Sequence, residues 1–113
     1  MIPPRILKQL ADRLTKQTRE GSIVWHRERS DLQRYIHDLS RGKIVVYYNY
    51  SRGGADTIEL AVTDSSNQVI GSLVAEEHEP GYDELADLVF EIQREEGDAH
   101  RVLTDEILDL LKP

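Results

Sequence analysis

Apolar residues near the start of the chain recur every three or four positions, which is the spacing of an amphipathic helix. They are Ile6, Leu7, Leu10, Ala11 and Leu14. Pro4 suits the first turn of a helix, where a missing N–H is tolerated. Gly21 suits the left-handed position that ends a helix. The pattern therefore predicts a helix from about Pro4 to Glu20 with a mostly basic outer face.

From residue 22 to residue 75 the pattern changes to short β-branched and aromatic runs between turn residues, which indicates strands. The clearest run, Lys43 to Tyr50, is apolar on both faces and predicts a central strand. Residues 22–27 predict a short strand, and residues 57–63 and 69–75 predict two more. We expect the strands at residues 43–50, 57–63 and 69–75 to form an antiparallel meander.

Residues 30–41 fit two structures. Ser30-Asp31-Leu32-Gln33 matches a helical capping box, and the apolar residues that follow have helical spacing. The alternative is a strand from Arg34 to Leu39 that forms a hairpin with the central strand. Local rules alone favour the helix.

The C-terminal third predicts two helices. The first runs from about Tyr82 to Glu96 and ends at Gly97. The second occupies roughly Ala99 to Leu111, and its apolar stripe is Leu103, Ile107, Leu110 and Leu111. The whole chain, residues 1–113, is therefore expected to be one α+β domain. It comprises an N-terminal helix, an antiparallel meander of four to five strands, and two C-terminal helices packed on one sheet face.

This layout resembles a family of small bacterial α+β domains, most of them uncharacterised. The similar segments are the leading helix, residues 18–25 (Thr-Arg-Glu-Gly-Ser-Ile-Val-Trp), residues 35–39, residues 60–64, residues 69–73 and the leucine-rich C-terminal part. The resemblance implies a hairpin for residues 34–50, and so a strand rather than a helix at residues 34–39. It implies no catalytic residues.

Charge divides the chain into two unlike halves. Residues 1–55 hold 11 Lys/Arg against 5 Asp/Glu, a net charge of +6, whereas residues 56–113 hold 3 against 16, a net charge of −13. Such asymmetry indicates a binding surface, pairing between the halves, or nucleic acid. The complementary signs favour helices that pair either within one molecule or between the subunits of a homodimer.

The residues offer no recognisable catalytic or metal centre. The chain has no Cys, which excludes disulfides, thiolate metal ligands and a Cys nucleophile. No histidine pair has the spacing of a helical zinc motif, and no Gly-x-Ser-x-Gly elbow is present. Glu76-Glu77-His78-Glu79 contains ligand types for a cation, but a solvated acidic loop is the simpler interpretation. We therefore expect neither enzyme activity nor a cofactor.

The composition instead favours a protein-interaction or adaptor module, which we expect to be a homodimer. The candidate interaction surface is Arg5, Lys8, Lys16, Arg19, Trp25, Tyr48, Tyr50 and Arg52. Trp25 also fits a core position. The alternative function is binding of single-stranded RNA or DNA by the basic N-terminal half and the Tyr47–Arg52 hairpin, because Tyr and Arg can stack on exposed bases. The lack of an apolar leader or a long apolar run predicts a cytoplasmic protein with no membrane partner.

Overall fold

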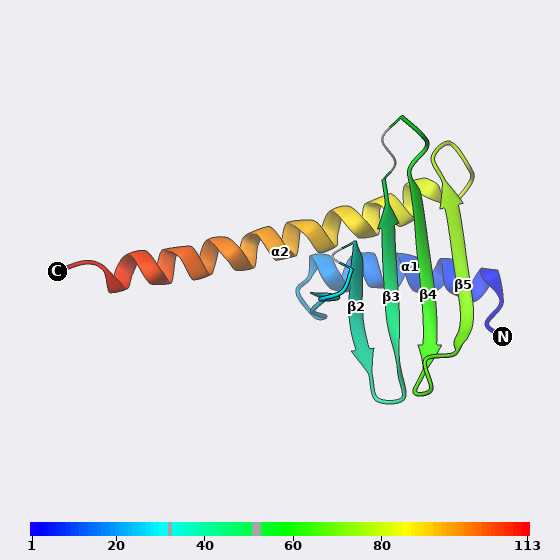
Figure 1. The fold of residues 1–113 in the computed structure, drawn as a ribbon, viewed down its shortest axis with the longest axis horizontal. Coiled ribbons are helices and arrows are strands. Elements are labelled where there is room, and N and C mark those ends of the chain that lie inside the picture. The colour runs from blue at the N-terminus through cyan, green and yellow to red at the C-terminus, as the bar shows by residue number, and fades with distance from the viewer. Residues whose placement is uncertain (32, 51–52) are drawn as a thin grey trace.

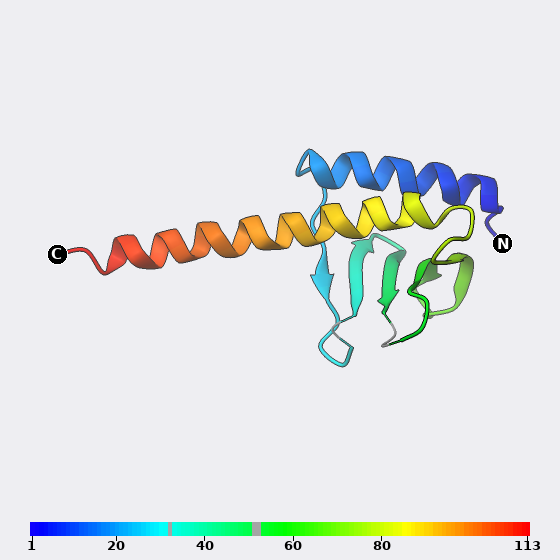
Figure 2. The same cartoon turned by 90° about the horizontal axis from the view of Figure 1, so that it is seen from above.

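The fold is a five-stranded sheet with two helices on one side. The computed structural model describes residues 1–31, 33–50 and 53–113. The elements in chain order are α1 (Pro4–Arg19), β1 (His26–Arg27), β2 (Arg34–Leu39), β3 (Gly42–Asn49), β4 (Thr57–Asp64), β5 (Val69–Glu76) and α2 (Tyr82–Leu110). The strands pair antiparallel in sequence order, with β3 in the centre (Figure 1). Both helices lie on the same side of the sheet (Figure 2), so the predicted α+β class is confirmed.

Residues 34–39 form a strand in a hairpin with β3, as the resemblance implies, and the helix favoured by local rules is wrong. β2 pairs with β3 through partners such as Tyr35 and Val46. Tyr35 and Ile36 are adjacent in sequence and both buried. Because neighbouring side chains of a strand point to opposite faces, Tyr35 lies on the core face and Ile36 on the face away from the helices. Pairing with β3 therefore overrides the local helical signal.

The strand predicted for residues 22–27 is mostly absent. Only His26 and Arg27 pair with β2. Residues 22–25 instead connect α1 to the sheet, after Gly21 ends α1 with a positive φ of 75°. The helix prediction for residues 4–20 is confirmed to within one residue.

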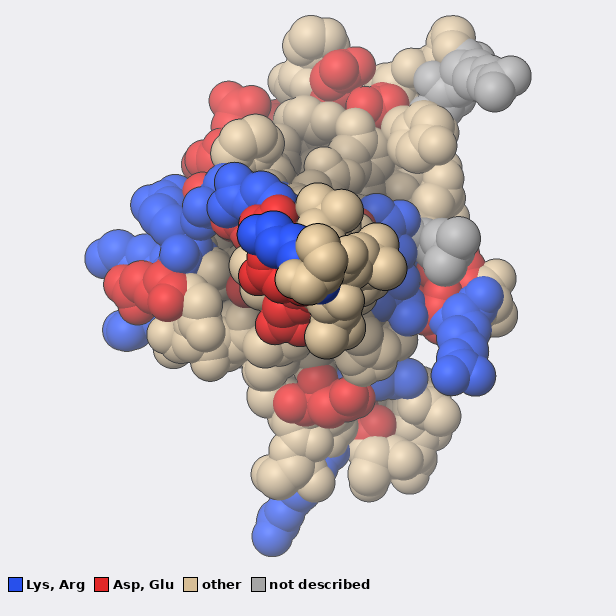
Figure 3. Space-filling model, turned by 90° about the vertical axis from the view of Figure 1, so that its left-hand side faces the viewer, with Lys and Arg blue, Asp and Glu red and all other residues tan. Residues whose placement is uncertain are grey.

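The two predicted C-terminal helices are a single helix, and the break expected at Gly97 is wrong. α2 runs without interruption for 29 residues. The carboxylate of Asp98 lies 3.8 Å from Arg94 and 3.5 Å from Arg101, so ion pairs of helical spacing span the glycine. A glycine inside a helix costs only about 1 kcal/mol, and no proline lies between Gly97 and Leu110 to end the helix there. Figure 3 views the molecule from the side on which α2 emerges.

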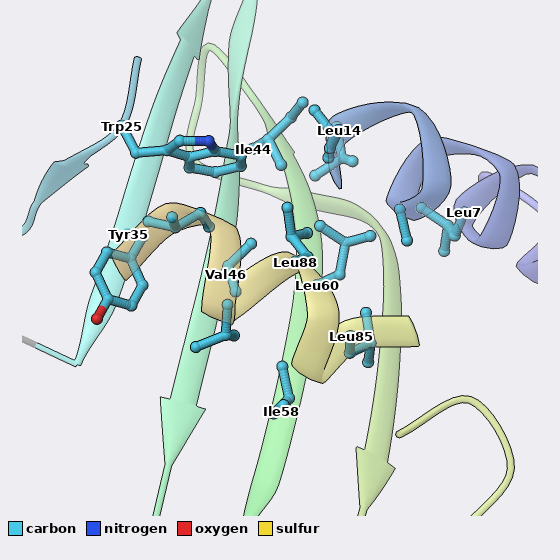
Figure 4. Close-up of a cluster of buried hydrophobic side chains, with 14 of the residues drawn as sticks. Leu7, Leu14, Trp25, Tyr35, Ile44, Val46, Ile58, Leu60, Leu85 and Leu88 are labelled. Carbon is cyan, nitrogen blue, oxygen red and sulfur yellow. The ribbon is translucent and has the colours of Figure 1, made fainter. Parts of the chain in front are cut away.

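The core lies between the sheet and the two helices (Figure 4). Each helix supplies one stripe, and the strands supply the residues that face it. The most deeply buried members are Leu7, Val46, Ile58, Leu60, Leu85, Leu88 and Ile92. The opposite face of the sheet is partly open, because Ile36 and Ala61 are buried there while Val74 is 54% exposed.

Candidate interaction surface

The C-terminal half of α2 extends beyond the sheet. At 1.5 Å per residue, α2 is about 43 Å long. The sheet that it crosses spans about 19 Å from β1 to β5 at the usual strand spacing. α2 therefore overhangs the β1–β2 edge, as Figures 1 and 2 show. Every residue from 97 to 113 is exposed. We call residues 97–111 the projecting segment.

The projecting segment is rich in exposed apolar side chains. Six large aliphatic residues there are about half exposed or more: Val102 (54%), Leu103 (55%), Ile107 (49%), Leu108 (55%), Leu110 (84%) and Leu111 (75%). In Figure 3 the end nearest the viewer carries uncharged side chains bordered by acidic and basic ones. Four of them, Leu103, Ile107, Leu110 and Leu111, share one side of the helix, and an exposed apolar patch of this kind marks an interaction site more often than an inert surface.

The apolar stripe of the projecting segment continues the stripe that α2 buries in its own core. At 100° per residue, Leu103 and Leu110 point within about 20° of the direction of Leu85. Leu85 is fully buried against the sheet. One continuous face of α2 is therefore covered by the sheet in its first half and uncovered in its second half.

Some of the charges of the projecting segment are paired along the helix. Arg101 lies 3.5 Å from Asp98, and Lys112 lies 3.1 Å from Asp109. The Thr104 hydroxyl donates to the carbonyl oxygen of His100 at 2.9 Å. Asp105 and Glu106 are exposed without an ion pair among the described residues, so acidic groups border the apolar stripe.

A hollow lies at the base of the projecting segment, where α2 leaves the sheet. We call it the basal hollow. Its volume is about 220 Å³, and its lining residues are Val24, Trp25, Tyr35, Ile92, Glu95, Glu96, Ala99 and His100. Val24 is 71% exposed there. An exposed valine beside an uncovered helix face enlarges the apolar surface at this edge.

An ion pair lies beside the basal hollow and involves one of its lining residues, Glu96. Arg27 donates to both carboxylate oxygens of Glu96, at 2.8 and 2.9 Å. The hydrogen bond from Arg27 holds the pKa of Glu96 below its usual value. The guanidinium of Arg27 also lies 5.0 Å from the centre of the Tyr35 ring. Glu96, the polar residue within the apolar stripe, is thus satisfied by its own chain.

Glu95 carries one unsatisfied oxygen in the basal hollow. Its Oε2 is buried and has no hydrogen-bond partner among the described residues. Burial raises the pKa of Glu95 above the usual carboxylate value, and a hydrogen bond from the backbone N–H of Trp25 offsets only part of that rise. Exclusion of water from this corner therefore favours the neutral acid.

The predicted basic face of α1 is divided between pairing and exposure. Arg19 donates to Glu91 of α2 at 3.1 Å, and Arg94 donates to the other oxygen of the same carboxylate at 2.9 Å. Arg5, Lys8 and Lys16 are exposed on the outer side of α1. The complementary charges of the two helices therefore meet within one molecule, at least at the end of α1.

Trp25 lies in the core, which was the predicted alternative to a place on the interaction surface. It is only 9% exposed, and its Nε1 donates to the Thr18 hydroxyl at 2.9 Å. Its ring lies 5.6 Å from that of His37. It closes the inner wall of the basal hollow rather than projecting from the surface.

Tyr48 and Tyr50 lie together at one end of β3. The Tyr48 hydroxyl donates to Asp56 at 2.8 Å, and the two rings meet edge to face at 5.8 Å. Tyr50 is 61% exposed. Arg52 lies outside the described residues. Tyr47 points to the opposite sheet face, where its ring lies 5.1 Å from the guanidinium of Arg34.

The two tyrosines border a second concavity, which we call the tyrosine hollow. Its volume is about 560 Å³, and its lining residues are Arg27, Gln33, Tyr35, Tyr48, Tyr50 and Gln93. Gln93 donates to the Tyr35 hydroxyl at 3.2 Å. The structure thus brings predicted aromatic residues from β3 together with residues that sequence reasoning did not select.

The acidic loop at residues 76–79 forms no metal centre. Within the part of the chain that the structure describes, no three metal-ligating side chains converge. Glu79 instead accepts a hydrogen bond from the backbone N–H of Glu76 at 3.0 Å. Among the described helices, none combines the length and the apolar character needed to cross a bilayer.

Searches against protein-family models, curated proteins and solved structures found no match. The resemblance to small bacterial α+β domains therefore stays a prediction. The projecting segment was missed from sequence because its stripe was assigned to a third helix packed on the sheet. One signal was present: Val102 and Leu108 lie outside that stripe, and a helix that packs on one face does not require them.

Proposed function

We propose that this protein is a non-catalytic interaction module that forms a homodimer through its projecting segment. The observation that carries the proposal is the run of six exposed aliphatic side chains on a helix that extends past its own core. Such a helix leaves apolar surface in water unless another molecule covers it.

The second copy is the occupant that fits this surface most simply. It supplies an apolar helix face of the same length. An isologous interface then covers both projecting segments at once. Other partner proteins with an apolar helix compete for the same surface and are outcomes of the test below.

The apolar area can be compared with the cost of association. Fully burying an exposed aliphatic side chain contributes about 1.5–3 kcal/mol. The four stripe residues Leu103, Ile107, Leu110 and Leu111 are between about half and four-fifths exposed, so covering them in both copies contributes about 8–16 kcal/mol. Association costs about 4–15 kcal/mol in lost freedom. A dissociation constant near 1 μM needs a surplus of about 8 kcal/mol, which this surface supplies when the association cost is near the lower end of its range.

Analytical ultracentrifugation over about 1–100 μM tests the proposal. The natural chain is expected to be dimeric in the upper part of this range. The double variant L103K/I107K is expected to stay monomeric, because two charges then lie in the apolar stripe. D105K makes the same change in net charge on the polar side of the helix and is expected to dimerise normally. A natural chain that stays monomeric throughout contradicts the proposal.

The tyrosine hollow supports a second candidate function, the binding of an exposed nucleobase. Three tyrosines line it together with amide and guanidinium groups, which are the groups that stack on and hydrogen-bond to bases. Arg27 is engaged by Glu96, however, and α1 lies away from the hollow. Fluorescence anisotropy with a short single-stranded oligonucleotide tests this candidate. Binding that weakens with salt and with Tyr50→Ala supports it, and no binding at low salt contradicts it.

A further inference from the structure

We infer that the two copies pair with their α2 helices antiparallel, so that Leu110 and Leu111 of each copy enter the basal hollow of the other. This inference rests on the proposed self-association. It adds the relative direction of the two helices, their register, and the residues that meet at each end of the interface. It turns the basal hollow into a binding site for the end of α2 from a second copy.

The direction follows from where each copy keeps its sheet. The stripe of the projecting segment points to the same side as the stripe that the sheet covers. In a parallel pair, the second helix would therefore run back into the space that α1 and the sheet occupy at the base (Figures 1 and 2). In an antiparallel pair, the two sheets lie at opposite ends and both apolar stripes are covered.

The register follows from the wall at the base of the projecting segment. A helix laid along the stripe can advance only until it meets Val24 and Trp25, which line the basal hollow. Ala99 lies at that wall, and Leu111 is about 18 Å further along α2. When the end of the second helix reaches the wall, residues 99–111 of one copy lie alongside residues 99–111 of the other. The two-fold axis then passes near residue 105.

This register brings matching side chains together. Leu103 of one copy packs beside Ile107 of the other, and the reciprocal pair repeats across the axis. At each end, Leu110 and Leu111 of one copy contact Val24 and Ala99 of the other. The side chains that the pairing covers at the ends are the most exposed ones, since Leu110 is 84% and Val24 71% exposed.

The basal hollow suits aliphatic side chains of a second copy. Its volume of about 220 Å³ is several times the ~30 Å³ of a water molecule. Of its two lining carboxylates, Glu96 is paired with Arg27. The other, Glu95, has its pKa raised by burial, so an apolar neighbour costs it less than it would cost an ordinary carboxylate.

Disulfide trapping tests the arrangement. Because the natural chain has no cysteine, only the introduced cysteines can form a disulfide. V24C and L111C are prepared as separate chains, mixed and oxidised. We expect a covalent heterodimer on non-reducing gels. The corresponding mixture of V24C with S66C, a matched exposed position in the β4–β5 turn, is expected to give none. In one chain, residues 24 and 111 are too far apart to pair, because a disulfide needs Cα atoms within about 7 Å.

The outcomes separate this inference from the proposed function. Sedimentation of the same unoxidised chains shows whether a dimer is present. A dimer that traps V24C with L111C supports the antiparallel arrangement. A dimer that instead traps L111C with itself, or traps neither pair, overturns the arrangement and leaves self-association standing. Monomeric chains with no trapping overturn both.

Discussion

Arg19 at the end of α1 and Glu91 in the middle of α2 are 72 residues apart in sequence, and their side chains meet at 3.1 Å. The carboxylate of Glu91 also accepts a hydrogen bond from Arg94 at 2.9 Å. Burial alone would raise the pKa of Glu91, but the hydrogen bonds from Arg19 and Arg94 outweigh it and hold the pKa below its usual value. The basic and acidic parts of the chain are thus joined inside one molecule.

Replacing Glu91 with Gln is expected to lower the free energy of unfolding by about 1.5–3 kcal/mol at pH 7, because two charge-assisted hydrogen bonds weaken. A group whose folded-state pKa is lowered stabilises the fold above its unfolded pKa and stops doing so as the pH falls through the folded pKa. The difference between natural chain and variant should therefore shrink below about pH 4. Urea unfolding of both chains across this pH range, at one fixed protein concentration, measures the difference in the free energy of unfolding. The exposed Asp87→Asn is the control, and an equal effect there would contradict the assignment.

Gly97→Ala is expected to raise the free energy of unfolding by about 0.5–1 kcal/mol, because alanine has the higher helix propensity. A Cβ atom at this position meets nothing within 4 Å. Gly42→Ala is the matched contrast, since its Cβ would overlap the carbonyl oxygen of Thr63 in β4 and should destabilise the sheet. Thermal unfolding followed by circular dichroism distinguishes them. Destabilisation by Gly97→Ala would indicate a helix break at this glycine.

The hydrogen bond to Asp56 and partial burial raise the pKa of Tyr48 to about 12. Because the folded-state pKa lies above the unfolded value of about 10, Tyr48 stabilises the fold below pH 10. That contribution disappears as the pH rises toward 12. Asp56→Asn removes the neighbouring anion and should bring the titration of Tyr48 back toward pH 10. NMR titration of ¹³C-labelled tyrosine checks this, and an unchanged midpoint in the variant would rule out Asp56 as the cause.

Thr18→Val is expected to cost about 1–3 kcal/mol, because it leaves the buried Nε1–H of Trp25 without its hydrogen bond while keeping the side-chain shape. Thr18→Ser keeps the hydroxyl and loses a methyl group, so it serves as the matched variant. Chemical unfolding can be followed by tryptophan fluorescence, since Trp25 is the only tryptophan. If valine were tolerated better than serine, packing rather than the hydrogen bond would hold Trp25.

Part of the candidate site could be predicted from sequence. The helical spacing around Leu103 and Ile107 was visible, and so was the basic face of α1. The exposure of Leu103 was not visible, because a stripe at helical spacing is the same whether a sheet covers it or water does. The basal hollow was not visible either, since it joins Val24 to Ala99, which are distant in sequence.

The sequence by itself determined α1, the central position of β3, the meander and the opposite charges of the two halves. These follow from local periodicity and turn residues, which act over a few positions. Local periodicity did not decide that residues 34–39 are a strand, because pairing with β3 overrides a local helical signal. Only the tertiary structure decided that α2 continues through Gly97 and passes the edge of the sheet. Whether a helix face is covered depends on how far the sheet extends beneath it: here a helix of about 43 Å crosses a sheet of about 19 Å.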